Sequence, residues 1–340
     1  MRYGFWLPVF GGWLRNVEDE SMPATWPFVR DLALRAEEIG FDLTLIAELN
    51  LNDIKGPAAD SLDAWSTTAA LAAVTTKLEL MAAVRPTFHS PALLAKQAAN
   101  IDRISGGRLT LNVVSSWWKD EATRYGIPFD EHDDRYARTS EWLDVVSGCW
   151  REQNFSHSGK LYNVAENLLS PKPLASPRPT LYAGGESETA KNLIAQKCDA
   201  YLMHGDDPAT ITAKVADMRI RRAQHPHLPP LVFGVTGFCV LRDTDAEADR
   251  EVARITDVKQ FADGYKNYQQ FIAGSKLESE LSLRDYSVSN RGLRSGLIGS
   301  TATVLQRLQD FEAAGCSLVL LQSSPQREEM ERFAAEIIRA

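Results

Sequence analysis

The distribution of apolar residues predicts short buried strands that alternate with amphipathic helices. Apolar runs of strand length occupy residues 3–9, 41–46, 78–84, 109–114, 180–183, 200–203, 231–241 and 317–321. Such continuous runs are typical of parallel strands that are covered on both faces. Between most of them, apolar residues recur every three or four positions, as on the buried face of a helix. Eight strands that alternate with helices in 340 residues predict an α/β fold, a (β/α)8 TIM barrel with inserted loops.

Helix boundaries follow from residues that favour helix ends. Pro91 suits a first helical turn, Ser61 and Ser300 suit N-caps, and Gly40 suits a C-cap. The predicted helices span 28–39, 61–75, 91–104, a segment that ends at 150, 208–223, a segment that starts after 300, and 327–338. We therefore expect one domain over residues 1–340, with insertions near 154–179, as a small hairpin, and near 263–293, as an insertion or lid.

Polar residues gather where the fourth predicted strand ends. Asn112 lies within the apolar run 109–114, and Ser115-Ser116-Trp117-Trp118 follows at its carboxyl end. Proteins with parallel barrels bind ligands at that end of the strands. Polar groups between aromatic walls favour a planar ligand. A buried Asn112 bonded to backbone and two surface tryptophans remain an alternative.

A second candidate site opens the helix after strand 180–183. Gly184-Gly185-Glu186-Ser187-Glu188 combines two glycines, which allow close approach, with the free backbone N–H groups of a helix N-terminus. This pattern indicates an anion site that suits phosphate.

Composition narrows the class of ligand. The chain is 44% hydrophobic and 24% charged with a formal net charge of −8, so it can bury a large core. The acidic balance disfavours nucleic acid and anionic membranes as partners and favours a small molecule. The four cysteines are widely spaced and form no CxxC pair, which indicates neither a metal site nor a disulfide framework and fits the cytoplasm. We expect no signal peptide and no membrane-spanning segment.

Four sequence motifs occur in one order along the chain. They are RP...HSPALLAKQAANIDRISGGRLTLNVVSSWWKDE, EHDDRYARTSEWL, SPKPLASPRPTLYAGGESETA and GLIGSTATVLQRL. With them the chain resembles the bacterial luciferase-like flavin-dependent monooxygenases, and within that family the clade of alkanesulfonate, dimethyl sulfone and pyrimidine monooxygenases. The resemblance implies FMN as cofactor, supplied as FMNH2 by a separate NAD(P)H-dependent flavin reductase, with O2 as co-substrate and no metal. It also implies a homo-oligomer, a dimer or a tetramer.

The resemblance implies roles for individual residues. Asn112 and Ser115 would contact the flavin ring and, with Glu121, steer oxygen, while Arg294 would close a lid. The residues implied to bind the cofactor are Glu48, Asn112, Ser115, Glu121, Arg135, Tyr136, Gly184, Gly185 and Ser187. Three of these have ordinary structural alternatives, an ion pair with Asp133 or Asp134 for Arg135, a core position for Tyr136 and a helix cap for Ser187.

The chain departs from the alkanesulfonate enzymes at residues implied to bind substrate. Where those enzymes have His, Cys, Arg, His and Tyr, this sequence has Phe10, Ser61, Thr236, Phe238 and Ser324. Since a buried sulfonate needs positive charge and donors, the change favours a small neutral substrate such as a sulfone or a ring amide. The expected pocket residues are Trp6, Phe10, Trp13, His89 and Phe238. The alternatives are an alkanesulfonate or pyrimidine-type monooxygenase, a deazaflavin-dependent oxidoreductase and a non-catalytic flavin-binding relative.

Overall fold

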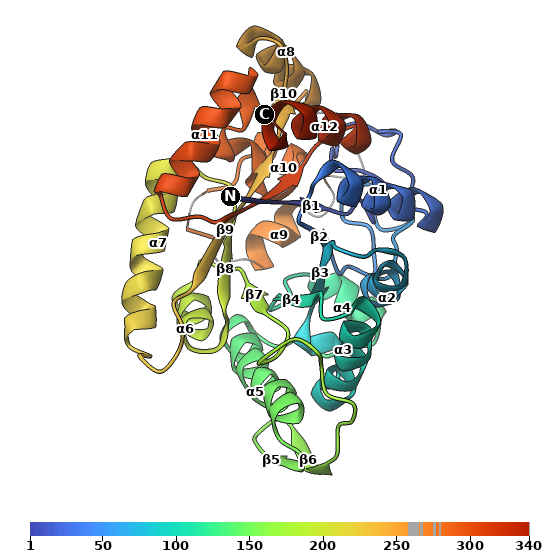
Figure 1. The fold of residues 1–340 in the computed structure, drawn as a ribbon, viewed down its shortest axis with the longest axis vertical. Helices are drawn as coiled ribbons and strands as arrows, with labels where there is room; N and C mark the ends of the chain where they lie inside the picture. The colour runs from blue at the N-terminus through green and yellow to red at the C-terminus, as the bar shows by residue number, and fades with distance from the viewer. Residues whose placement is uncertain (258–264, 266–267, 275–276, 279, 340) are drawn as a thin grey trace.

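The protein folds into a closed barrel of eight parallel strands surrounded by helices (Figure 1). The computed structural model describes residues 1–257, 265, 268–274, 277–278 and 280–339. Neighbouring strands follow the order β1-β12-β9-β8-β7-β4-β3-β2 around the barrel. The barrel strands are β1 (Arg2–Trp6), β2 (Leu43–Ile46), β3 (Glu79–Val84), β4 (Leu109–Val113), β7 (Leu181–Ala183), β8 (Ala200–Met203), β9 (Val232–Phe238) and β12 (Leu318–Gln322). The predicted (β/α)8 TIM barrel is confirmed.

Helices connect successive strands and cover the outside of the barrel (Figure 1). They are α1 (Trp26–Ile39), α2 (Ala64–Val74), α3 (Pro91–Ser105), α4 (Lys119–Arg124), α5 (His132–Arg151), α6 (Glu188–Lys197), α7 (Pro208–Ala223), α8 (Asp245–Ile255), α9 (Tyr268–Gly274), α10 (Leu283–Ser287), α11 (Thr301–Ala313) and α12 (Gln326–Phe333). Short helical turns span Pro86–Phe88, Ser289–Ser295 (η3) and Ala334–Ile338. Gly40 and Gly106 end α1 and α3 in the left-handed conformation, as their positions in the sequence predict.

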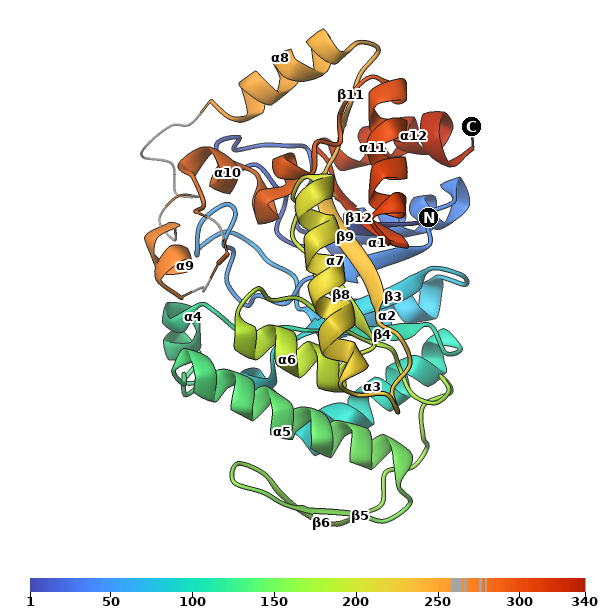
Figure 2. The ribbon, with the colours of Figure 1, turned by 90° about the vertical axis from the view of Figure 1, so that its left-hand side faces the viewer.

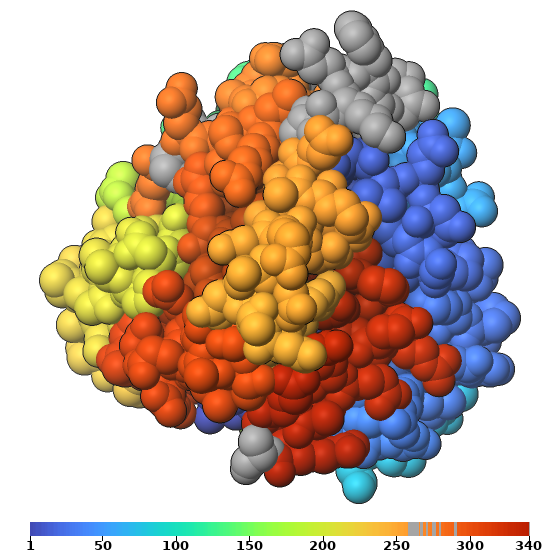
Figure 3. Space-filling view, turned by 90° about the horizontal axis from the view of Figure 1, so that it is seen from above, coloured from blue at the N-terminus to red at the C-terminus, as the bar shows by residue number. Residues whose placement is uncertain are grey.

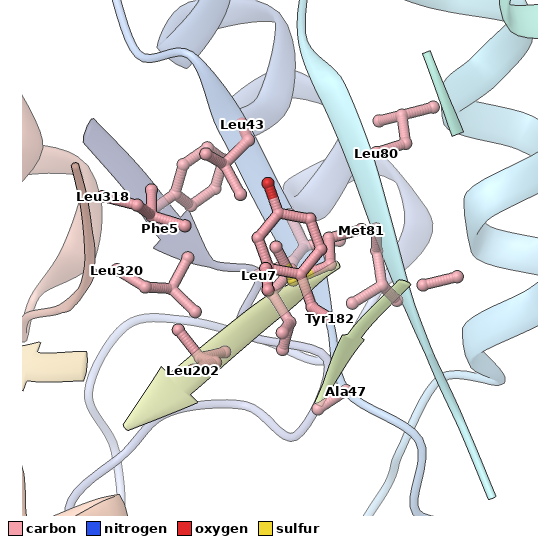
Figure 4. Close-up of a cluster of buried hydrophobic side chains, with 14 of the residues drawn as sticks. Phe5, Leu7, Leu43, Ala47, Leu80, Met81, Tyr182, Leu202, Leu318 and Leu320 are labelled. Carbon is pink, nitrogen blue, oxygen red and sulfur yellow. The ribbon is translucent and has the colours of Figure 1, made fainter. Parts of the chain in front are cut away.

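Apolar side chains from all around the barrel fill its interior. Figure 4 shows Leu43, Tyr182, Leu202 and Leu320 directed toward one another. Gly4 belongs to the same layer, because a Cβ atom on it would lie 2.7 Å from Leu43 and 2.9 Å from Leu320. The barrel is therefore a packed core, and a ligand can enter only at its ends.

Several local predictions needed correction. Asp63 caps α2 by accepting a hydrogen bond from the Ser66 N–H, so Ser61 is not the cap. The apolar run 231–241 forms two strands, since β10 (Val240–Leu241) leaves the barrel to pair with β11 (Ile298–Gly299). Helices α4 and α8 were not predicted: α4 has only six residues, and the buried face of α8, formed by Ala248, Val252 and Ile255, lies in a stretch of mostly charged residues.

The first expected insertion forms a hairpin that packs along the second half of α5 (Figure 2). Strands β5 (Phe155–Ser158) and β6 (Asn163–Asn167) pair antiparallel. Glu141 on α5 accepts hydrogen bonds from the backbone N–H groups of Leu161 and Tyr162 at 3.0 and 2.8 Å. The second expected insertion, 263–293, contains α9 and α10, and part of it lies outside the described residues.

The first and last parts of the chain lie next to each other. Strand β1 pairs with β12, and Figure 3 shows the blue N-terminal and red C-terminal segments meeting beside α8. Among the helices that the structure describes, none has the length and hydrophobicity needed to cross a bilayer.

Candidate active site

A cavity of about 270 Å³ lies at the carboxyl ends of the barrel strands. Its walls come from strand ends and from the loops that follow them, the place where barrel enzymes bind their ligands. It brings together ten of the residues expected to bind cofactor or substrate: Trp6, Phe10, Trp13, Glu48, Asn112, Ser115, Arg135, Tyr136, Gly184 and Gly185. Residues from the first half of the barrel thus meet residues from α5 and from the loop after β7.

Strand β4 and helix α5 supply the polar wall of the cavity. The Asn112 side chain is buried, and its Oδ1 atom has no hydrogen-bond partner among the described residues. Ser115 shares a 2.9 Å hydrogen bond with Thr139 on α5. Arg135 is buried, and its guanidinium donates to the backbone carbonyl of Asp130. Burial raises the pKa of Tyr136, so its phenol stays protonated and can donate at neutral pH. This wall therefore offers an acceptor, hydroxyls and a cation.

The loop after β7 forms a narrow cradle beside that wall. A Cβ atom on Gly185 would lie 2.6 Å from the Ala190 side chain and 3.1 Å from the Tyr136 hydroxyl, and its φ of 154° strains other residues. A Cβ atom on Gly184 would lie 2.8 Å from the Leu202 carbonyl oxygen. Ser187 is the N-cap of α6, where its hydroxyl accepts from the Ala190 N–H at 3.2 Å, and it does not line the cavity. The predicted helix N-terminus is confirmed, with its glycines turned to the cavity.

A buried charge network supports the third wall. Arg85 follows β3 and forms an ion pair with Glu121, with 1% and 0% of the two residues exposed. Glu121 also accepts from the backbone N–H of Asn50 at 2.5 Å and does not line the cavity. Glu48 does line it, and its carboxylate accepts from the Arg85 N–H at 2.6 Å and lies 2.5 Å from His89 Nε2. Glu121 and His89 thus stand behind the residues that face the cavity.

Aromatic side chains also line the cavity. The Trp6 and Trp13 rings lie edge to face at 6.2 Å, and the Trp13 indole donates to Gln326 at 2.6 Å. Trp117 also lines the cavity and stacks on the buried Trp118 at 5.4 Å. The sequence left the role of these two tryptophans open, and the structure divides it, since one faces the cavity and the other packs beneath it.

Two further predicted residues, Phe238 and Arg294, lie outside the cavity. Phe238 is buried against Gly292 of η3, whose Cβ position lies 2.7 Å from Phe238, and the neighbouring Thr236 lines the cavity in its place. Arg294 pairs with Asp285 at 2.7 Å and donates to the Glu280 carbonyl at 2.5 Å. Both placements involve η3, which packs over the end of β9 and which the sequence does not predict.

A buried group of charges beside the cavity has no counterpart among the residues predicted from the sequence. Glu186 pairs with Arg291 of η3 and with Lys214 of α7, and Lys214 also pairs with Asp206 at 2.7 Å. Burial alone would raise the pKa of Glu186, but the surrounding positive groups bring it to about 2. His204 lies in the same group and lines the cavity. It directly follows strand β8, so the strand-end rule that identified Asn112 could have found it.

A second buried group closes the cavity near α10. Arg15 pairs with Asp53 at 2.5 Å, and its guanidinium lies 3.9 Å from the centre of the Tyr286 ring. The Tyr286 hydroxyl donates to Asp53 at 3.3 Å. No local motif signals these contacts, because the three residues lie far apart in sequence.

Comparison with known proteins places this site in a family. The model of the luciferase-like monooxygenase family matches residues 1–318. Two relatives are FMNH2-dependent dimethylsulfone monooxygenases, from Pseudomonas putida with 32% identity over 99% of this chain and 94% of the relative, and from Pseudomonas fluorescens with 31% identity over 99% and 93%. The solved structure of a long-chain alkane monooxygenase has the same fold, with a TM-score of 0.84 at 17% identity over 100% of this chain and 90% of that one. The chain therefore belongs to the luciferase-like monooxygenase family.

Proposed function

We propose that the protein is a two-component monooxygenase that uses FMNH2 and O2 to oxygenate a small, uncharged organosulfur compound of the dimethyl sulfone type. The observation that carries the proposal is one cavity whose lining combines a glycine cradle, polar side chains and aromatic side chains. The 32% identity to a dimethylsulfone monooxygenase over 99% of the chain supports the same activity.

The residues present fit a flavin mononucleotide. The cradle at Gly184 and Gly185 has no room for a Cβ atom and leads to the N-terminus of α6, which suits a phosphate close to the backbone. Arg135 would add charge-assisted hydrogen bonds and Tyr136 its hydroxyl. The Asn112 Oδ1 atom, which has no partner within the described part of the chain, would accept an N–H group of the flavin ring, and Ser115 would stand beside it.

The protein contributes binding, orientation and exclusion of water. When bound, reduced flavin supplies the electrons that activate O2. Trp6, Phe10 and Trp13 exclude water from the space that remains, which favours transfer of oxygen to the substrate over loss to solvent. Glu48 faces the cavity and is hydrogen-bonded to the partly exposed His89, so this pair would hold a proton near the reacting atoms.

The charges near the substrate space are compensated within the protein. Arg15 pairs with Asp53, Arg85 with Glu48 and Glu121, and Arg291 with Glu186. A sulfonate would have to compete with these carboxylates for its counter-ion, whereas a sulfone needs only neutral donors. This arrangement supports an uncharged substrate over an alkanesulfonate.

The test is a reconstitution with chemically reduced FMN. We expect the purified protein to convert dimethyl sulfone to an oxygenated product in the presence of O2, with product mass as the readout, and to show no turnover when FMNH2 is omitted. Oxidation of a reduced deazaflavin cofactor without O2 uptake would overturn the proposal. Addition of an NAD(P)H-dependent flavin reductase should sustain turnover, and light scattering would test the expected dimer or tetramer.

A further inference from the structure

Two neutral polar side chains follow or end neighbouring strands at the cavity, His204 after β8 and Thr236 on β9. Strands β8 and β9 pair in parallel with Met203 opposite Val235, so His204 and Thr236 are the next residues in register. The backbone confirms the proximity, because a Cβ atom on Gly205 would lie 2.9 Å from the Thr236 carbonyl oxygen. Both His204 and Thr236 line the cavity.

Neither side chain has its hydrogen-bonding capacity filled within the described structure. The Thr236 hydroxyl oxygen is buried in a residue that is 5% exposed, and it has no partner among the described residues. No hydrogen bond joins a ring nitrogen of His204 to another residue in the described ranges. A buried donor without a partner is costly, so the Thr236 hydroxyl marks a place that a ligand can fill, and the partly buried His204 ring lines the same cavity.

The charges around His204 keep its imidazole neutral. It faces Arg291 of η3, Glu186 of the loop after β7, Lys214 of α7 and Asp206 of its own loop. Burial and the positive charge of Arg291 lower the pKa of His204 to about 4. At neutral pH the ring therefore carries one N–H donor and one acceptor and no charge.

We propose that His204 and Thr236 form a subsite for the substrate's oxygen atoms. Their N–H and O–H groups donate hydrogen bonds to the oxygens of an uncharged sulfone, sulfoxide or amide and so select it over a sulfonate anion. This inference rests on the proposed function and adds the residues that set its substrate class. The Trp6 indole N–H lies in the same cavity, is buried and has no partner among the described residues, so it is available as a third donor.

The experiment compares two probes of similar size that differ in charge, dimethyl sulfone and methanesulfonate. Ligand-observed NMR would measure the Kd of each on the protein with oxidised FMN, so no turnover is required. The variants are Thr236→Val, Thr236→Ser and His204→Leu. The matched control is Thr44→Val, because the buried Thr44 hydroxyl already donates to the Phe5 carbonyl at 3.2 Å on the barrel wall. Thermal melting would confirm that each variant is folded.

We expect the wild type to bind dimethyl sulfone at least about tenfold more tightly than methanesulfonate. Loss of one donor in Thr236→Val or His204→Leu should raise the sulfone Kd about three- to tenfold, the range for one hydrogen bond. Thr236→Ser should restore it, and Thr44→Val should leave it unchanged. Because His204 is neutral, sulfone affinity should stay constant between about pH 6 and 8.

Equal sulfone affinity in the wild type, Thr236→Val and His204→Leu would overturn the inference, as would tighter binding of methanesulfonate. The proposed function fails by a different readout, the absence of FMNH2-dependent product from the wild type. Amide and sulfoxide probes in the same assay would show which neutral oxygen acceptor the subsite prefers.

Discussion

The buried ion pair of Arg85 and Glu121 gives the sharpest prediction, because the family resemblance implies that Glu121 contacts the flavin while the structure places it behind Arg85. Removal of one partner from a buried pair costs about 3–5 kcal/mol of stability. Glu48 remains 3.5 Å from the Arg85 Nε atom, so Glu121→Gln leaves the guanidinium one carboxylate, and we expect a loss of about 3 kcal/mol. Arg85→Met leaves two carboxylates without their cation, so its cost should approach about 5 kcal/mol.

The assay is urea unfolding of the two single variants and the double variant. Because both substitutions disrupt one network, the double variant should lose at least about 1 kcal/mol less than the sum of the single losses. Asp31→Asn is the control, since it breaks an ion pair with Arg30 in which the side chains are 41% and 48% exposed. Such an exposed pair should contribute below about 1 kcal/mol.

A second measurement decides whether Glu121 contacts the cofactor or only holds Arg85 in place. Calorimetric titration with FMN should show a smaller effect of Glu121→Gln on binding than on unfolding, because the carboxylate does not line the cavity. If this variant unfolded like the wild type and lost FMN affinity more than about tenfold, the supporting role of Glu121 would be refuted.

Three further predictions test the cradle, the barrel base and the insertion. Gly185→Ala should abolish measurable FMN binding. Gly106→Ala is the control, because Gly106 also has a positive φ, of 72°, but open space around its Cβ position. It should cost about 1 kcal/mol of stability and leave FMN binding intact. Burial opposes ionisation of Glu37, yet hydrogen bonds from the backbone of residues 76–78 lower its pKa from 4.5 to about 2. The stabilisation by the ionised Glu37 carboxylate is therefore complete above about pH 5 and is lost as the pH falls toward 2. At pH 7, Glu37→Gln should lower the free energy of unfolding by about 1–2 kcal/mol, after a discount for solvent screening. This difference between wild type and variant should vanish near pH 2. Arg294→Ala should leave FMN affinity unchanged and lower the free energy of unfolding by less than about 1 kcal/mol. A loss of FMN binding in this variant would show that Arg294 contributes to the cofactor site.

Local periodicity predicted most of the barrel, because each strand and helix carries its own hydrophobic pattern. Helix Pro208–Ala223 and strand Ala200–Met203 have the predicted boundaries. The helix N-cap at Asp63 was missed because Ser61 and Asp63 are both good caps, and which of them is used depends on where the preceding loop runs. Short polar helices such as α4 depend on tertiary contacts and leave little periodic signal.

The same reasoning found half of the site and missed contacts made across the barrel. Asn112 and Ser115 follow from the position of one strand end. Phe238 and Thr236 both lie on β9, and only η3, which comes more than fifty residues later, decides which of them faces the cavity. The partners of Glu121 are equally distant, since Arg85 lies on another strand end. Side-chain pairing between remote segments cannot be read from spacing along one of them.

Helix α5 joins the cofactor residues to the hairpin at the far end of the molecule (Figure 2). Arg135 and Tyr136 lie in its first turns, and the tip of the β5–β6 hairpin folds back to Glu141 near its middle. About 9 Å of helix therefore separates Arg135 from the residue that holds the hairpin tip. All four native cysteines are buried, so a thiol introduced by Lys160→Cys on the exposed hairpin would be the accessible attachment point for a dye. Flavin is itself fluorescent, and resonance energy transfer over this short separation would report cofactor occupancy in single molecules.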